Sequence, residues 1–168
     1  MKTIPLEQFT ESEPCSCHVC VDYCKRPCWP IPAEALRLID AGYANRLMAD
    51  AWIAEEGPIW LLCGANPGYE GKNASGLDGY MNMMFGLLEM LAGTTPLNSG
   101  CIFLRNGLCE LHDAGLKPFE GRVAHHSRDS GDIHEAVAAA WNNDEGRAII
   151  ARWRTLVGCP DGIIVEPD

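Results

Sequence analysis

The chain has 168 residues, of which 47% are hydrophobic and 21% charged, and its formal net charge is −10 at pH 7. This length suits one domain, and the apolar fraction excludes a wholly disordered chain. The negative charge argues against nucleic-acid binding, because phosphate backbones are bound by clustered Lys and Arg. The sequence has no apolar run of about 18 residues and no apolar leader, so it predicts a cytoplasmic protein without membrane contact.

The N-terminal part carries a dense group of cysteines behind an irregular, acidic arm over residues 1–14. Five of the nine cysteines are Cys15, Cys17, Cys20, Cys24 and Cys28. The C-x2-C spacing of Cys17 and Cys20 is typical of thiolates that reach one metal ion from a tight turn. A disulfide here would close a very small, strained loop, and a reducing cytoplasm keeps thiols unpaired. A metal-bound loop over residues 15–28 is therefore favoured over a disulfide-rich one.

Helical and strand patterns follow the cysteines. Pro32 suits the first turn of a helix, and Gly42 suits the left-handed position after its end. An apolar stripe predicts a second helix over residues 43–55. The short apolar run 59–63 comes after a Gly-Pro breaker and predicts a buried strand, with Cys63 as a small core residue.

Two segments in the middle of the chain offer binding hypotheses. The glycine-rich stretch 64–79 departs from the phosphate-binding pattern at Asn66 and Asn73, so a surface loop is favoured over a nucleotide site. Residues 80–91 form a Met-rich helical pattern. We expect this stripe in the core or, if it is exposed, as an oligomer or partner surface.

Residues 101–112 predict a β-hairpin, because two apolar runs flank Asn106-Gly107. A two-residue turn, which Asn-Gly itself suits, would pair positions 105 and 108. A three-residue turn would pair positions 103 and 109 and put Cys101 on the face of Cys109. We expect the three-residue turn, because it presents both thiolates to the N-terminal cysteines.

The C-terminal part predicts an extended segment over 115–122 and then two helices over 132–157. Asp132 is the expected N-cap of the first and Asn143 that of the second, which Gly158 ends. The expected fold is a mostly helical α+β single domain over 1–168, with a small antiparallel sheet and a Cys-rich metal-bound N-terminal loop.

Two features together resemble a known family. One is the cysteine cluster followed by Pro32-x-Glu34; the other is Cys101-x-Phe103-Leu104 … Gly107-x-Cys109-x-x-His112 … Lys117-Pro118. They are similar to the YkgJ-type cysteine-cluster proteins, described as zinc- or iron-chelating domains. Over roughly residues 15–122 the resemblance implies ligands from both ends of that span, and relatives within flagellin lysine methylases imply an iron–sulfur cluster. The chain departs from the family in lacking adjacent cysteines in the first cluster and a cysteine after Lys117-Pro118.

The predicted metal ligands are Cys17, Cys20, Cys24, Cys28, Cys101 and Cys109. The best single set is Cys17, Cys20, Cys24 and Cys109, with Cys101 as the next choice. Cys15 and Cys28 would serve a second centre, and His112 is a further donor. One zinc ion or four-iron cluster takes four protein ligands, so spare donors or two centres both remain open. His125, His126 and His134 have no helical ligand spacing and are not expected to bind metal.

Two functions fit these residues. The first is a cytoplasmic metal-binding protein, with zinc slightly favoured over iron, whose site joins the N-terminal cluster to the hairpin and which acts through a protein partner. The second is an enzyme or redox component that uses an iron–sulfur cluster or iron. No catalytic nucleophile motif, zinc-protease motif or phosphate loop is present, so no catalytic residue is assigned.

Overall fold

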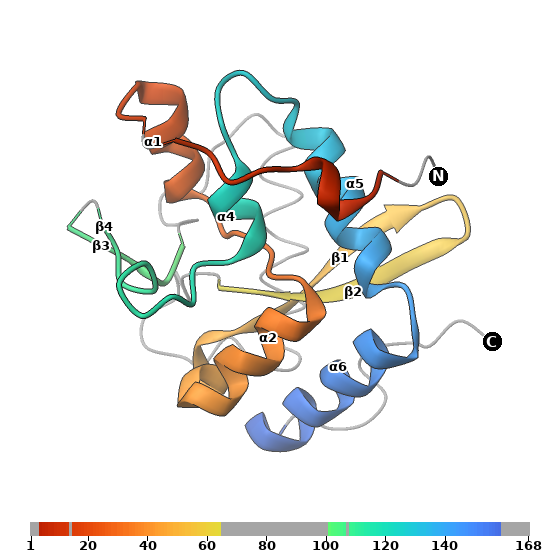
Figure 1. Ribbon diagram of the computed structural model, residues 1–168. Helices are drawn as coiled ribbons and strands as arrows, with labels where there is room; N and C mark the ends of the chain where they lie inside the picture. Colours follow the sequence, from red (N-terminus) through yellow and green to blue (C-terminus); the bar gives the residue numbers. More distant parts are fainter. Residues whose placement is uncertain (1–3, 14, 65–100, 107, 159–168) are drawn as a thin grey trace, which may run out of the picture.

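The computed structural model describes residues 4–13, 15–64, 101–106 and 108–158 (Figure 1). The strands are β1 (Met48–Ala54), β2 (Gly57–Cys63), β3 (Leu104–Arg105) and β4 (Leu108–Cys109). The helices are α1 (His18–Lys25), α2 (Pro32–Leu38), α4 (Phe119–Val123), α5 (Ser130–Trp141) and α6 (Asp144–Val157), with short helical turns at Leu6–Gln8, Ile39–Tyr43 and Ala44–Arg46. Helices around small antiparallel hairpins confirm the predicted α+β class. None of the helices in the described part of the chain is long and apolar enough to cross a membrane.

The β1–β2 hairpin is the central sheet of the described residues. The strands pair from Met48↔Cys63 to Ala54↔Gly57, and a two-residue turn joins them. The predicted strand is therefore confirmed, but the predicted helix over 43–55 is wrong. The Ala and Met residues of this segment favour a helix locally, but pairing with the strongly apolar β2 outweighs that preference.

The core lies between the β1–β2 hairpin and the helices α2, α5 and α6. Its largest fully buried side chains are Trp141, Trp153, Phe103, Leu38, Leu61 and Leu62. Both tryptophans have hydrogen-bond partners, because Trp141 Nε1 donates to the Pro30 carbonyl at 2.8 Å and Trp153 Nε1 to the Ala44 carbonyl at 2.9 Å. Cys63 is 1% exposed within this core, as its place in the apolar run predicted.

Helix ends follow the capping rules with one shift. Asn143 caps α6 as predicted, since its Oδ1 accepts from the Gly146 N–H at 2.9 Å, and Gly158 ends the helix at φ +70°. The expected cap at Asp132 is wrong. Asp129 caps α5 instead, accepting from the Gly131 N–H at 2.8 Å, so the helix begins three residues before the expected start.

Three further expectations need correction. The β3–β4 pairing joins Arg105 to Leu108, so the hairpin has the two-residue turn and the favoured three-residue register is wrong. Asn106 takes φ +51°, a left-handed conformation that Asn tolerates, and this stabilises the shorter turn. Residues 119–123 form α4 rather than an extended segment, and residues 18–25 form a helix rather than a loop. The glycine-rich residues 65–79 and the Met-rich segment 80–91 lie outside the described residues.

Candidate metal centre

The N-terminal arm is fastened to the C-terminal end of α4 and to Arg128 in the segment that follows (Figure 1). The Ser12 N–H donates to the Arg122 carbonyl at 2.9 Å, and Ser12 Oγ donates to the Val123 carbonyl at 2.8 Å. Arg128 closes the contact, because its Nη1 donates to the carbonyls of Thr10 at 2.6 Å and Val123 at 2.7 Å. These bonds hold the arm, and the cysteines that follow it, next to residues that come more than 100 positions later in the chain.

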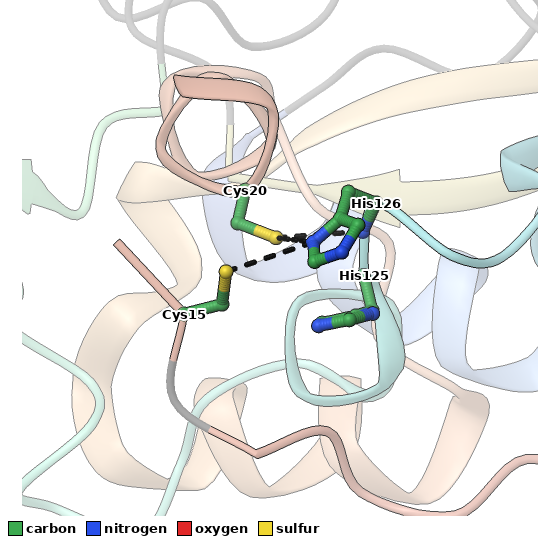
Figure 2. A group of neighbouring side chains, drawn as sticks. All are labelled: Cys15, Cys20, His125 and His126. Carbon is green, nitrogen blue, oxygen red and sulfur yellow. Dashed lines mark hydrogen bonds between the residues drawn. The ribbon is translucent and has the colours of Figure 1, made fainter. Parts of the chain in front are cut away.

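Three cysteine sulfurs surround one imidazole nitrogen at the end of this arm. The Nδ1 atom of His126 lies 3.6 Å from Cys15 Sγ, 3.5 Å from Cys17 Sγ and 3.5 Å from Cys20 Sγ. Figure 2 shows the sulfurs of Cys15, on the arm, and Cys20, on helix α1, directed at the His126 ring. The backbone N–H of His126 also donates to Cys20 Sγ at 3.4 Å.

These separations match those of a tetrahedral zinc site. Bonds of about 2.3 Å to sulfur and about 2.0–2.1 Å to nitrogen would place a sulfur ligand about 3.5–3.6 Å from a nitrogen ligand. His125 is a neighbouring donor, because the ligand atoms of Cys15, Cys20, His125 and His126 all lie within 4.8 Å of one another. Among the described residues, this Cys/His cluster is the one group with metal-binding geometry of this kind.

Helix α1 prepares Cys17 to bind as a thiolate. Cys17 is the N-cap residue of α1. The backbone N–H of Cys20 faces its sulfur and lowers the pKa of the Cys17 thiol, with partial burial acting against this and Val19 N–H adding to it. Burial raises the pKa of Cys20 to about 11, and the neighbouring thiols Cys17 and Cys15 add to the rise. Several thiolates so close together need a cation beside them, which a metal ion supplies.

A second group of cysteines lines a small cavity between the end of the cluster and the β3–β4 hairpin. Cys28, Cys101 and Cys109 share the walls of this cavity with Phe103, Leu111 and Lys117. Its volume is about 20 Å³, and a cavity of at least about 10–15 Å³ holds one water-sized sphere. These sulfurs do not converge as closely as the ligand atoms at His126. Among the described residues that line this cavity, no three ligand atoms all lie within 4.8 Å of one another.

Backbone contacts draw the second group together. The Cys101 N–H donates to the Lys25 carbonyl at 2.9 Å, which fixes the strand of Cys101 against the end of α1. Burial raises the pKa of the Cys101 thiol, and the nearby Cys109 adds to it, while the N–H groups of Phe103 and Cys28 act in the opposite direction. Backbone N–H groups directed at a sulfur favour a thiolate there.

The predicted ligands thus fall into two places. Cys17 and Cys20 lie at His126, whereas Cys28, Cys101 and Cys109 line the other cavity. The side chain of Cys24 lies outside what the structure describes. His112 is exposed and is not part of either group. Sequence reasoning missed His126 as a candidate ligand, because only the fold brings it next to cysteines 106–111 positions earlier.

Searches for similar proteins found no match to a protein-family model, to a curated protein or to a solved structure. The resemblance to the YkgJ-type family therefore stays a prediction. The case for function rests on the Cys/His cluster itself, which has the donors and the spacing to hold a metal ion.

Proposed function

We propose that the protein binds one zinc ion through Cys15, Cys17, Cys20 and Nδ1 of His126. The observation that carries the proposal is that three sulfurs lie 3.5–3.6 Å from one imidazole nitrogen. Three thiolates and one imidazole form a donor set typical of structural zinc sites. The N–H of His126 at Cys20 Sγ adds the kind of hydrogen bond that orients a metal-bound thiolate.

The proposed role of this zinc is structural. Four protein ligands fill a tetrahedral zinc ion and leave no position for a substrate. The site ties the arm and α1 to the segment after α4, which joins the first 20 residues to the remainder of the fold. Because this zinc ion has no open position, we propose that the protein functions by binding a protein partner and not by catalysis at the metal.

A second centre is proposed at Cys28, Cys101 and Cys109. Its support is the ion-sized cavity that all three line and the backbone N–H groups directed at Cys101. Three thiolates select soft or borderline ions such as Zn²⁺ or iron in a cluster. This centre, rather than the one at His126, would join the N-terminal cluster to the hairpin, as the sequence predicted.

Metal analysis of protein purified without chelators and without oxygen tests both proposals. We expect two metal equivalents per chain in the wild type and about one in Cys20→Ser and in His126→Ala. His125→Ala separates two possible ligand sets, because the ligand atom of His125 also lies within 4.8 Å of those of Cys15, Cys20 and His126. We expect this variant to keep both equivalents, whereas loss of one equivalent would make His125 a ligand in place of Cys17. Full metal content in both Cys20→Ser and His126→Ala would reject the His126-centred site.

Optical spectra of the same samples separate zinc from iron. An iron–sulfur cluster absorbs visible light and bleaches on reduction, whereas zinc is colourless. Replacing zinc by Co²⁺ should give the visible bands of a tetrahedral thiolate-bound ion, and these bands should weaken in His126→Ala. A brown protein that bleaches with dithionite would favour the alternative function, an iron–sulfur enzyme or redox component.

A further inference from the structure

A second cavity, of about 190 Å³, lies beside the metal centres and contains ionisable groups that the metal sites do not use. The residues that matter for its chemistry are Tyr23, Arg26, Trp29, Asp50, Glu120 and His134. They come from α1 and the segment after it, from β1, from α4 and from α5. Sites for drug-sized ligands measure roughly 300–1,000 Å³, so this cavity suits a smaller molecule.

The inner part of the cavity is acidic. Asp50 keeps both oxygens bonded to the protein, since Oδ1 accepts from the Ala51 N–H at 2.8 Å and Oδ2 from Trp29 Nε1 at 2.9 Å. Burial raises the pKa of Asp50, and the nearby charge of Glu120 adds to the rise. Asp50 still lines the cavity, so the remaining lone pairs of its carboxylate are available to an occupant.

Glu120 and His134 form a pair next to Asp50. Glu120 Oε2 accepts from the Trp29 N–H at 2.6 Å, and Oε1 bonds to His134 Nε2. The His134 ring stacks against the Trp29 indole at a centroid distance of 4.8 Å, which fixes its position. When His134 is protonated, its charge offsets that of Glu120, and the Asp50 carboxylate remains as the excess negative charge of the inner part.

The outer part of the cavity is basic. Arg26 is exposed and lines the cavity, and its guanidinium is close enough to His134 to disfavour the protonated ring. Ser130, the first residue of α5, also lines the cavity and offers a hydroxyl group that can donate to an anion. The cavity therefore has an anion-attracting opening and a cation-attracting interior.

We propose that this cavity binds a small zwitterion of the amino-acid class. Its ammonium group would lie against Asp50 and Glu120, and its carboxylate would lie against Arg26 and Ser130. A cation alone would leave Arg26 without an anion in the cavity, and an anion alone would meet two carboxylates inside. Only a ligand with both charges complements both parts.

Calorimetric titration of the metal-loaded protein with matched compounds tests the proposal. The probes are glycine, β-alanine and γ-aminobutyrate, which differ in the spacing of their charges, with propylamine and propionate as single-charge controls. We expect one of the zwitterions to bind about tenfold or more tightly than either control, because a hydrogen-bonded charge is lost in each control. Binding of propylamine as tight as that of every zwitterion, or no binding of any probe, would overturn the proposal.

Variants assign the two parts of the cavity. Arg26→Gln should weaken the best zwitterion about tenfold and leave propylamine unchanged, and Asp50→Asn should weaken both. Arg152→Gln is the matched control, because Arg152 is an exposed arginine on α6 paired with Asp40 at 2.6 Å and does not line the cavity. Arg26 is exposed, so this variant stays interpretable if Asp50→Asn fails to fold.

Metal content is measured in each variant, because Cys28 lines both this cavity and the small cavity that it shares with Cys101 and Cys109. The proposal does not rest on the metal sites. Loss of zwitterion binding with both metals retained would support it, whereas unchanged zwitterion binding in Arg26→Gln and in Asp50→Asn would contradict it.

Discussion

Cys20 and His126 meet through two contacts, although 106 positions separate them in the chain. The backbone N–H of His126 lies 3.4 Å from Cys20 Sγ, and Nδ1 of its ring lies 3.5 Å from the same sulfur. One histidine thus offers both a metal ligand and the hydrogen bond that orients the neighbouring thiolate. Substitutions at these two positions should have the same effect on the arm.

The first prediction is that Cys20→Ser and His126→Ala both loosen the N-terminal arm. Leu6 and Phe9 pack against the core at the start of the arm, but residues 10–17 include no large apolar side chain. The order of residues 10–17 therefore depends on the bonds at the metal and on the contacts of Ser12 and Arg128. Structural zinc contributes roughly 10–16 kcal/mol of apparent binding free energy in small peptides. Tryptic cleavage after Lys25 should accelerate in both variants and in wild type treated with a chelator, whereas the Arg26–Pro27 bond resists trypsin in every sample. Cleavage as slow as in the metal-loaded wild type would contradict a structural metal.

The second prediction concerns the hairpin cysteines. Cys109→Ser should remove about one metal equivalent and leave the centre at His126 loaded, because Cys109 lines the small cavity that it shares with Cys28 and Cys101. Cys159→Ser is the control and should keep both equivalents, because no other Cys or His lies near Cys159 in the sequence. If Cys109→Ser retains the full metal content, Cys28, Cys101 and Cys109 do not form a centre.

The third prediction concerns Glu34, the one buried charged side chain among the described residues, which is 3% exposed. Its Oε2 accepts from the Phe119 N–H at 2.7 Å, and its Oε1 pairs with Arg122. Glu34→Ala should lower the free energy of unfolding by about 3–5 kcal/mol, because it leaves the buried Phe119 N–H without its acceptor and removes the buried partner of Arg122.

Glu11 supplies the control for that substitution. It pairs with the same Arg122 but is 69% exposed, so Glu11→Ala should cost only about 0–1 kcal/mol. Urea unfolding of the metal-loaded proteins measures both values. If the two substitutions lowered the free energy of unfolding equally, the burial of Glu34 would not be the reason that its ion pair stabilises the fold.

The fourth prediction is a pH dependence that arises from His134. Burial acts to lower its pKa, but the hydrogen bond and charge of Glu120 raise it above the usual value of 6.5 overall. The protonated ring therefore stabilises the fold. Its contribution is fully present below about pH 6.5 and is lost as the pH rises through the raised, folded-state pKa.

His134→Gln removes this contribution. The difference in unfolding free energy between wild type and variant should be largest near pH 6 and should shrink as the pH rises. Both proteins are measured with saturating metal, so that proton release at the thiolates cancels in the comparison. A difference that stays constant or grows with pH would show that His134 is not held in its charged form by Glu120.

The fifth prediction concerns the turn at Asn106. Asn106→Ala should destabilise the hairpin by about 1–2 kcal/mol, because alanine strongly disfavours φ +51°, whereas Asn106→Gly should not. Because Cys109 pairs opposite Leu104 in this register, the alanine variant should also bind the second metal equivalent more weakly. Competition with a coloured zinc chelator measures that affinity.

The sequence predicted correctly those elements whose conformation depends on contacts between residues close together in the chain. The helix that begins at Pro32, strand β2 and the cap at Asn143 rest on neighbouring residues, and these predictions were confirmed. The prediction of a helix in place of strand β1 was wrong, because the conformation of β1 is set by its pairing with β2 rather than by its own residues.

The candidate site shows the same division. The spacing of Cys17 and Cys20 was enough to predict thiolate ligands, since both come from one turn. His126 had no such signal: its neighbours along the chain are His125 and Ser127, and its cysteine partners become adjacent only when Arg128 fastens the arm. Had the sequence reasoning required a nitrogen ligand, the His125-His126 pair would have been a candidate.

The fastening of the arm also bears on the order of events during synthesis. Ser12, Cys15 and Cys20 leave the ribosome more than 100 residues before their partners Val123 and His126. Chain growth at about 5–20 residues per second leaves the cysteines without His126 for several seconds at least. During that interval the thiols are open to oxidation or to the wrong metal, so a metal ion that uses His126 as a ligand can bind fully only after the segment that carries His126 has been made.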